Sequence, residues 1–169
     1  MADLITQLKR KSFELRMMLL QMCIQAGTGH TTSSLSCIDI LVALYYGQIL
    51  RFDPKNPQWE ERDWLICSKG QASPALYVCL SDLGFFPRDN LASFAQEGGK
   101  FGVHLQKDVP GVELTVGSLG QGFGVAAGIA LGAKMNRLPF LVFALLRDVG
   151  YAFHSLAFNG ISYHHQWSG

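Results

Sequence analysis

Apolar residues recur every three or four positions near the N-terminus, and this spacing predicts an amphipathic helix over residues 3–26. Gly27 is expected to end it. A polar turn follows, and a second helical pattern then runs over residues 35–45. Ser34 or Ser36 is the expected cap of this second helix, because a side-chain hydroxyl there can accept a hydrogen bond from a free amide of the first turn.

Two short apolar runs predict buried strands, one over residues 64–67 and one over residues 140–146. Helical patterns over residues 72–83 and 88–96 lie between them, the first with a proline in its opening turn, where it is tolerated. Helices that alternate with short apolar strands indicate an α/β fold. The prediction is a parallel sheet with helices on both faces and loops gathered at the carboxyl ends of its strands.

A glycine-rich turn stands between the two predicted strands. An extended run over residues 110–116 leads into Gly117-Ser118-Leu119-Gly120-Gln121-Gly122, and a helix rich in alanine and glycine continues to about Asn136. Glycines let backbone amides approach an anion closely, and the N-terminus of the following helix adds its positive dipole end. The pattern favours a phosphate or diphosphate site, although a turn selected for tight packing has the same composition.

Four glycines form one stripe along the predicted helix. Gly120, Gly124, Gly128 and Gly132 are spaced by four residues. Each interior glycine costs about 1 kcal/mol relative to alanine, so a close neighbour is expected against this face. The neighbour is either another helix of the same domain or another subunit.

Composition narrows the class of protein. The chain has 169 residues, 49% of them hydrophobic, and a net charge of +1, so we expect a globular domain with no electrostatic preference for nucleic acid or membrane surfaces. Its four cysteines lack zinc spacing and are expected to be free buried thiols in a reducing compartment. No apolar run approaches the length of about 20 residues that spans a bilayer, and the N-terminus lacks a signal-peptide core, which predicts a cytoplasmic protein.

Candidate chemistry lies in three polar loops. His30 follows Gly29, residues 68–71 (Ser-Lys-Gly-Gln) follow the first strand, and His104 lies in the long loop before the glycine turn. A single histidine is more often structural than catalytic. Two of them in such loops favour a site that moves protons near neutral pH or binds sugar hydroxyls and phosphates.

These motifs, taken in order, resemble the N-terminal, pyrophosphate-binding half of transketolases, and above all the split kind whose halves are separate chains. The matching stretches are Gly29-His30, Ser34-Leu35-Ser36, Asp39-Ile40-Leu41, Leu44-Tyr45, Arg51-Phe52-Asp53-Pro54, Ser68-Lys69-Gly70, Ala72-Ser73, Ala75-Leu76-Tyr77, Pro110-Gly111-Val112-Glu113 and Gly117-Ser118-Leu119-Gly120-Gln121-Gly122. The resemblance covers residues 1 to about 148.

The resemblance implies the thiamine-diphosphate-binding fold of the pyrophosphate-domain type, incomplete at the C-terminus. It implies the cofactors thiamine diphosphate and Mg²⁺, and transfer of a two-carbon ketol unit between sugar phosphates. It also implies an oligomer with a pyrimidine-domain (C-terminal) subunit, which carries the glutamate that activates the cofactor. The implied site residues are the cofactor-binding Gly117, Ser118, Leu119 and Gly120, the catalytic His30 and His104, and the metal ligand Asp148.

Three departures from the family pattern concern the chemistry. Gln71 stands where the family has a catalytic histidine, and the family's glycine after Gly-His is replaced around Thr31-Thr32. The family's Gly-Asp-Gly metal motif reads Arg147-Asp148-Val149 here. We therefore predict a partial transketolase-like domain over residues 1–148 and a divergent tail over residues 149–169, which contains no Asp, Glu, Lys or Arg.

Two functional hypotheses stay open. In the first, the chain is the N-terminal subunit or fragment of a thiamine-diphosphate-dependent transketolase and needs a pyrimidine-domain partner. In the second, it is a truncated, non-catalytic relative that acts only as a binding or assembly module. The altered metal motif favours the second, and the intact glycine turn favours the first. A deoxyxylulose phosphate synthase is disfavoured by the motifs at residues 68–70 and 117–122.

Overall fold

The computed structural model describes residues 2–117, 120–146, 155–158 and 162–163. The described strands form one sheet in the order β1 (Trp64–Cys67), β2 (Val142–Leu145), β3 (Ser155–Phe158) and β4 (Ser162–Tyr163). Strands β1 and β2 run parallel, as predicted, and β3 and β4 add antiparallel pairings at the β2 edge. The predicted tail beyond residue 148 therefore contributes two strands.

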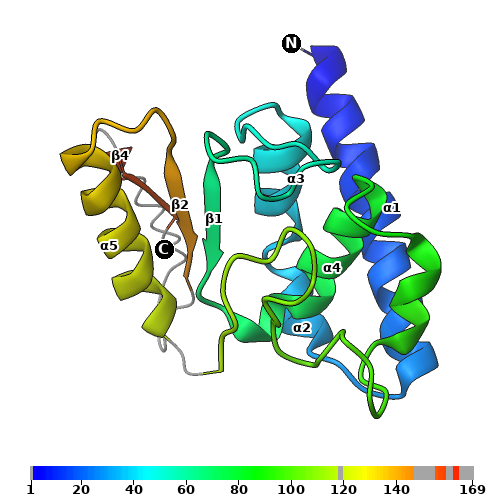
Figure 1. Cartoon of the computed structure of the whole chain (residues 1–169). Helices are drawn as coiled ribbons and strands as arrows, with labels where there is room; N and C mark the ends of the chain where they lie inside the picture. The colour runs from blue at the N-terminus through cyan, green and yellow to red at the C-terminus, as the bar shows by residue number, and fades with distance from the viewer. Residues whose placement is uncertain (1, 118–119, 147–154, 159–161, 164–169) are drawn as a thin grey trace, which may run out of the picture.

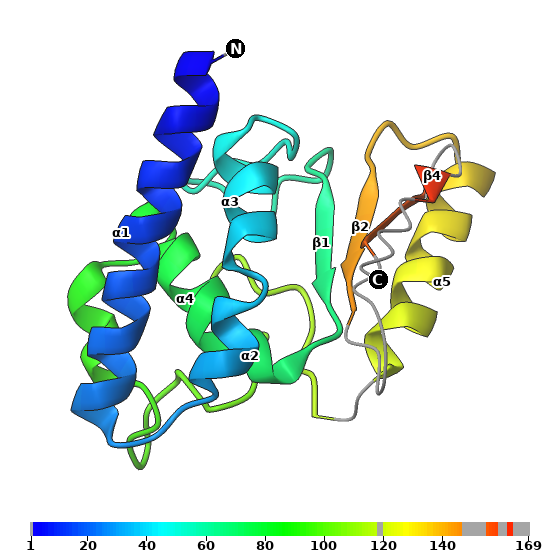
Figure 2. The same cartoon turned by 180° about the vertical axis from the view of Figure 1, so that it is seen from behind.

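Helices cover both faces of the β1–β2 pair, which confirms the predicted α/β class (Figure 1). Helix α5 (Gln121–Met135) lies on one face, and helices α1 (Ala2–Ala26), α3 (Ile38–Tyr46) and α4 (Ser73–Asp82) lie on the other (Figure 2). Side chains alternate across the strands accordingly. Leu65, Cys67, Phe143 and Leu145 join the core under α1, α3 and α4, whereas Ile66, Val142 and Ala144 pack against alanines of α5.

Helix α1 matches the predicted range, and its C-terminal half supplies the buried stripe. Leu15 and Leu19 are fully buried, whereas Leu4 is 47% exposed because the first turns of the helix project beyond the domain (Figure 1). The helix ends at Gly27, whose φ of +65° lies in the left-handed region that glycine adopts without strain.

The prediction of a single helix over residues 35–45 is wrong about where the helix begins. The structure has two helices here, α2 (Thr31–Leu35) and α3, and the cap of α3 is Cys37 rather than a serine. The predicted caps have other partners: Ser34 Oγ donates to the carbonyl of Gln71 at 3.1 Å, and Ser36 Oγ donates to the carbonyl of Ser33. A long-range contact thus takes the hydroxyl of Ser34, and a local backbone carbonyl takes that of Ser36, so neither caps α3.

The helices predicted over residues 72–83 and 88–96 differ from the prediction, the first in its start and the second in its type. A 3-10 turn, η1 (Gly70–Ala72), precedes α4, and the helix predicted over residues 88–96 is the 3-10 helix η2 (Arg88–Ser93). Helix α4 is buried on every side from its first residue to Ser81, so it forms the centre of the helical layer.

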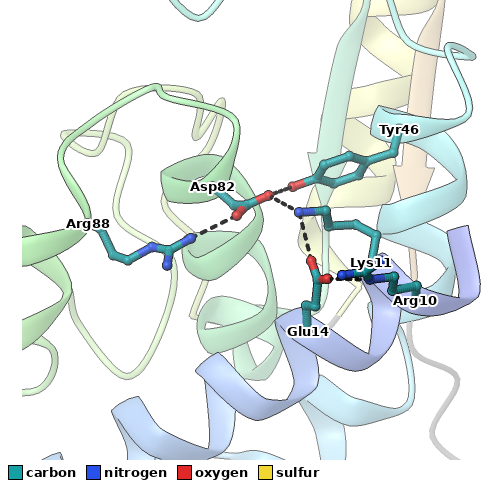
Figure 3. Close-up of polar contacts among 6 residues, drawn as sticks. All are labelled: Arg10, Lys11, Glu14, Tyr46, Asp82 and Arg88. Carbon is teal, nitrogen blue, oxygen red and sulfur yellow. Dashed lines mark hydrogen bonds and ion pairs between the residues drawn. The ribbon is translucent and has the colours of Figure 1, made fainter. Parts of the chain in front are cut away.

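A cluster of charged and polar residues ties this layer together. The carboxylate of Asp82 accepts hydrogen bonds from Tyr46 of α3 (2.6 Å) and Lys11 of α1 (2.9 Å) and pairs with Arg88 at 2.9 Å (Figure 3). Burial raises the pKa of Asp82, but the bonds from Tyr46 and Lys11 outweigh it and hold this pKa below its ordinary value.

The four cysteines are free and buried, as predicted. Burial raises the pKa of Cys37 to about 11 and that of Cys67 to about 12, so both stay protonated near neutral pH. Among the described residues, no helix is long and apolar enough to cross a membrane.

Candidate functional site

The loop after β1 meets the start of α5. The backbone N–H of Gly122 donates to Ser68 Oγ at 3.0 Å. A Cβ at position 122 would lie 2.7 Å from Ser68 Cβ and 2.9 Å from Ser68 Cα, so only glycine fits there. The N-terminus of α5 is therefore fixed directly against the carboxyl end of a parallel strand, where α/β folds place their ligands.

The loop over residues 68–71 also contacts the segment that carries His104. A Cβ at Gly70 would lie 2.8 Å from the carbonyl oxygen of Val116 and 3.1 Å from the His104 ring, so the three segments are in close contact. The Tyr77 hydroxyl donates to the His104 carbonyl and accepts from the Gln106 N–H, both at 3.2 Å. The segment that carries His104 is thus anchored on both sides of the histidine.

The structure brings together two of the predicted catalytic residues. The ring centroids of His30 and His104 lie 5.4 Å apart, at a tilt of 38°. His30 precedes α2 and is exposed, whereas His104 is half-buried. Two imidazoles this close can both contact one ligand.

Lys69 joins this loop to the turn that carries His30. Its side chain is buried, and Nζ donates to the Ser33 carbonyl at 2.5 Å and to Ser36 Oγ at 2.8 Å. Ser34 holds the carbonyl of Gln71 in addition. Three hydrogen bonds therefore join the 68–71 loop to the segment over residues 33–36.

The extended run before the glycine turn is anchored by a buried ion pair. Arg62 donates to both carboxylate oxygens of Glu113, at 2.7 and 2.9 Å, and its guanidinium lies over the Trp64 ring. Burial raises the pKa of Glu113 in spite of the hydrogen bonds from Arg62. Because the Glu113 side chain is held in this way, the extended run enters the glycine turn from a fixed direction.

The turn itself has the features of an anion site. Gly120 has a φ of +82°, a left-handed conformation that points the chain into α5, and Gly117 and Gly120 are both exposed. A Cβ at either glycine would have no described atom within 4 Å, so an anion can approach the backbone. The residues present fit a diphosphate, because the N–H groups and dipole of a 15-residue helix meet exposed glycines there. Ser118 and Leu119 lie outside the described residues.

The predicted metal ligand is not tested by the structure. Asp148, like Arg147 and Val149, lies outside the described residues. Within the described ranges, no cluster of three or more His, Cys, Asp or Glu side chains has the arrangement of a metal site.

The four glycines of the stripe do not share one physical cause. Gly120 is required by its backbone conformation, whereas a Cβ added at Gly124, Gly128 or Gly132 would have no described atom within 4 Å. The neighbouring helix of the same domain, one of the two predicted candidates, is therefore not found among the described residues. On this side α5 instead exposes apolar side chains, among them Leu131 (60%) and Met135 (75%).

Sequence reasoning gives no individual role to three residues that hold the site together. The sequence marks Ser68 and Lys69 as members of a candidate loop and of a family motif, and Tyr77 as part of a helix and of a family motif. The position of Ser68 directly after a buried strand is a usable signal for a site residue. Tyr77 gives no such signal, because its hydroxyl meets residues 27 and 29 positions away in the chain.

Fold and site together define an α/β domain with an anion site at a helix N-terminus beside two histidines. Residues 9–154 match the family model described as transketolase, thiamine diphosphate binding domain. The chain belongs to the transketolase family, and its domain is the one that binds thiamine diphosphate.

Relatives and solved structures agree with this assignment. The chain is 36% identical over 149 residues to the 6-deoxy-6-sulfo-D-fructose transketolase subunit SqwG of Clostridium sp. (strain MSTE9), covering 88% of this chain and 54% of that protein. It is 34% identical to an apulose-4-phosphate transketolase subunit of Phocaeicola vulgatus, covering 85% and 51%. The chain thus spans about half the length of these curated relatives.

The fold also matches a solved transketolase structure. The crystal structure of transketolase from Campylobacter jejuni superposes with a TM-score of 0.77 at 33% identity, over 83% of this chain and 23% of that one. The predicted fold of the pyrophosphate domain is thereby confirmed.

Proposed function

We propose that this chain is the thiamine-diphosphate-binding, N-terminal part of a transketolase that transfers a two-carbon ketol unit between sugar phosphates. The contact between Ser68 and Gly122 carries the proposal, because it fixes an anion-binding helix N-terminus at the carboxyl end of β1. The sugar phosphates themselves, and the cytoplasmic location, stay predictions.

The chain's own residues divide the work as follows. Backbone amides of Gly117 and Gly120, with Ser118 and Leu119 by resemblance, would hold the diphosphate, and Asp148 would hold Mg²⁺. Thiamine diphosphate, when bound, supplies the carbon nucleophile of ketol transfer. His30 and His104 bind the sugar and carry protons to and from its oxygens, a role for which imidazoles are well suited as general acids and bases.

A partner subunit is part of the proposal. Two of the relatives are named as transketolase subunits, and the chain spans about half of their length. The exposed apolar face of α5, with Leu131 and Met135 next to the glycines, supports a contact with a pyrimidine-domain subunit or within an oligomer. We also propose that the domain proper ends near residue 148 and that residues 149–169 diverge from the family.

One observation favours the non-catalytic alternative. The motif Arg147-Asp148-Val149 replaces Gly-Asp-Gly, and a fixed positive charge about 4 Å from a cation costs roughly 4 kcal/mol per unit charge at an effective dielectric of 20. The glycine turn offers only a few amide hydrogen bonds, each with a net value of about 1 kcal/mol. On this reasoning, the chain alone binds thiamine diphosphate weakly and Mg²⁺ adds little.

The experiment measures binding and transfer separately. Titration calorimetry with thiamine diphosphate, with and without Mg²⁺, is done on the chain alone and after co-expression with a pyrimidine-domain subunit. Ketol transfer from fructose 6-phosphate to an aldose phosphate acceptor is then assayed with the pair. Transfer that needs both chains and falls at least tenfold in His30→Asn or His104→Asn supports the catalytic proposal. A stable pair that never transfers the ketol unit supports the assembly module instead.

A further inference from the structure

A buried amide oxygen lacks a hydrogen-bond partner in the loop after β1. In the described part of the chain, three buried side-chain polar atoms have no partner: Trp64 Nε1, Gln71 Oε1 and Ser81 Oγ. Of these residues, Gln71 is the one in the loop beside the two histidines. An acceptor buried without a donor opposes folding, because water satisfies it in the unfolded chain.

The loop holds Gln71 in this unfavourable place. Ser34 Oγ donates to its backbone carbonyl at 3.1 Å. The preceding Gly70 fits tightly between Val116 and His104, and Lys69 on its other side is bonded to Ser33 and Ser36. These neighbours fix the backbone on both sides of Gln71, and its side-chain oxygen is buried beside them. An uncompensated polar group that persists under such restraint is typical of a functional position.

The chemistry of the atom selects its partner. An amide oxygen only accepts hydrogen bonds, and the phosphate oxygens of a diphosphate are themselves acceptors. The partner must carry an O–H or N–H group. We propose that Gln71 determines substrate specificity by accepting a hydrogen bond from a hydroxyl group of the sugar. This proposal rests on the proposed function and adds a role for the residue that replaces the family histidine.

The proposal predicts opposite effects of one substitution on stability and on sugar binding. Gln71→Met keeps the length of the side chain and removes both amide groups. It should stabilise the ligand-free chain, because no acceptor is then buried unpaired. It should weaken the sugar complex, because the sugar hydroxyl loses its acceptor. A side chain with only a packing role would not separate the two effects.

The first measurement is thermal unfolding of the full chain without ligand. Gln71→Met is expected to raise the midpoint by about 3 °C, the scale for relief of one buried unpaired group in a chain of this size. Gln58→Met is the matched control, since Gln58 is exposed in the loop before β1. Its midpoint should stay within about 1 °C of wild type. A lower midpoint for Gln71→Met would overturn the claim of an unpaired acceptor.

The second measurement uses the chain together with its pyrimidine-domain partner. Added D-fructose 6-phosphate should raise the unfolding midpoint of wild type and of Gln58→Met more than that of Gln71→Met. In transfer assays, the KM of Gln71→Met for this sugar should rise about tenfold, by a larger factor than kcat falls.

The affinity for thiamine diphosphate shows whether the hydrogen-bond donor to Gln71 Oε1 belongs to the sugar or to the cofactor. If that affinity falls in Gln71→Met while sugar binding is unchanged, the donor is an N–H of the cofactor and the proposal is wrong. A wild-type pair without transfer would refute the proposed function, whereas the two unfolding experiments would still decide the role of Gln71. An equal sugar-induced shift of the unfolding midpoint in wild type and in Gln71→Met would overturn the proposed role of Gln71.

Discussion

Two glycines of α5, two residues apart, should respond in opposite directions to the same substitution. At position 122 an added Cβ would lie 2.7 Å from Ser68 Cβ and 2.9 Å from its Cα. At position 124 it would have no described atom within 4 Å. We therefore predict that Gly122→Ala destabilises the chain and that Gly124→Ala stabilises it.

The magnitudes follow from these contacts. Alanine is favoured over glycine inside a helix by about 0.5–1 kcal/mol, and Gly124→Ala should gain this amount. Gly122→Ala must displace backbone atoms of Ser68, and overpacking of this kind costs about 1–3 kcal/mol. It also strains the 3.0 Å hydrogen bond from Gly122 to Ser68, which has a net value of about 1 kcal/mol. The two variants should differ by about 1.5–5 kcal/mol.

Urea unfolding of the chain without its partner measures the difference, because contacts across the exposed face of α5 are then absent. Gly122→Ala should also weaken thiamine diphosphate binding to the assembled pair, since the helix N-terminus moves away from the 68–71 loop. If both variants shift the unfolding midpoint in the same direction, the close approach of α5 to β1 is not what requires glycine at position 122.

Three further predictions concern other parts of the molecule. Gly128→Leu should weaken assembly with the partner at least tenfold, measured by analytical ultracentrifugation, because it adds bulk to the proposed contact face; unchanged assembly would place the contact elsewhere. Tyr77→Phe should cost about 1–2 kcal/mol in urea unfolding and lower transfer, because two hydrogen bonds that anchor the His104 segment are lost; normal values of both would count against that role. The lowered pKa of Asp82 means that its stabilising effect is present above its ordinary pKa of 3.8 and is lost as the pH falls through the lower folded value. Asp82→Asn should therefore unfold more easily at pH 7 and show a smaller loss of stability below about pH 4 than wild type, measured by thermal unfolding across pH; parallel profiles would contradict this.

The sequence predicted those elements whose signals are local. The run Trp64–Cys67 was predicted to the residue as a strand, because four apolar residues stand between a charged loop and a polar one. Helices α1 and α5 were also predicted closely, since periodicity and terminal glycines mark them. The start of α3 was missed, since the predicted cap Ser34 lies in α2 and bonds to Gln71, 37 positions later, a contact that no local pattern contains.

The candidate site was predictable in its residues but not in its arrangement. The motifs single out His30, His104 and the glycine turn, and the structure puts the two rings 5.4 Å apart. The contact between Ser68 and Gly122 depends on the parallel pairing of β1 and β2, which places α5 against the end of β1. The unpaired oxygen of Gln71 is a property of burial, and composition gives no sign of it.

The exposed glycines of α5 give a further argument for assembly with a second subunit. Three alanines, Ala126, Ala130 and Ala133, pack this helix on the sheet, so the glycines on its other side are not needed for contact with the described residues. Gly124 and Gly128 together cost about 2 kcal/mol relative to alanine, and no contact with the described residues recovers this loss. Leu131 and Met135 add exposed apolar area to the same helix. If the proposed contact with a second subunit uses this face, which costs stability in the free chain and offers close backbone approach, stability and assembly should be linked through α5.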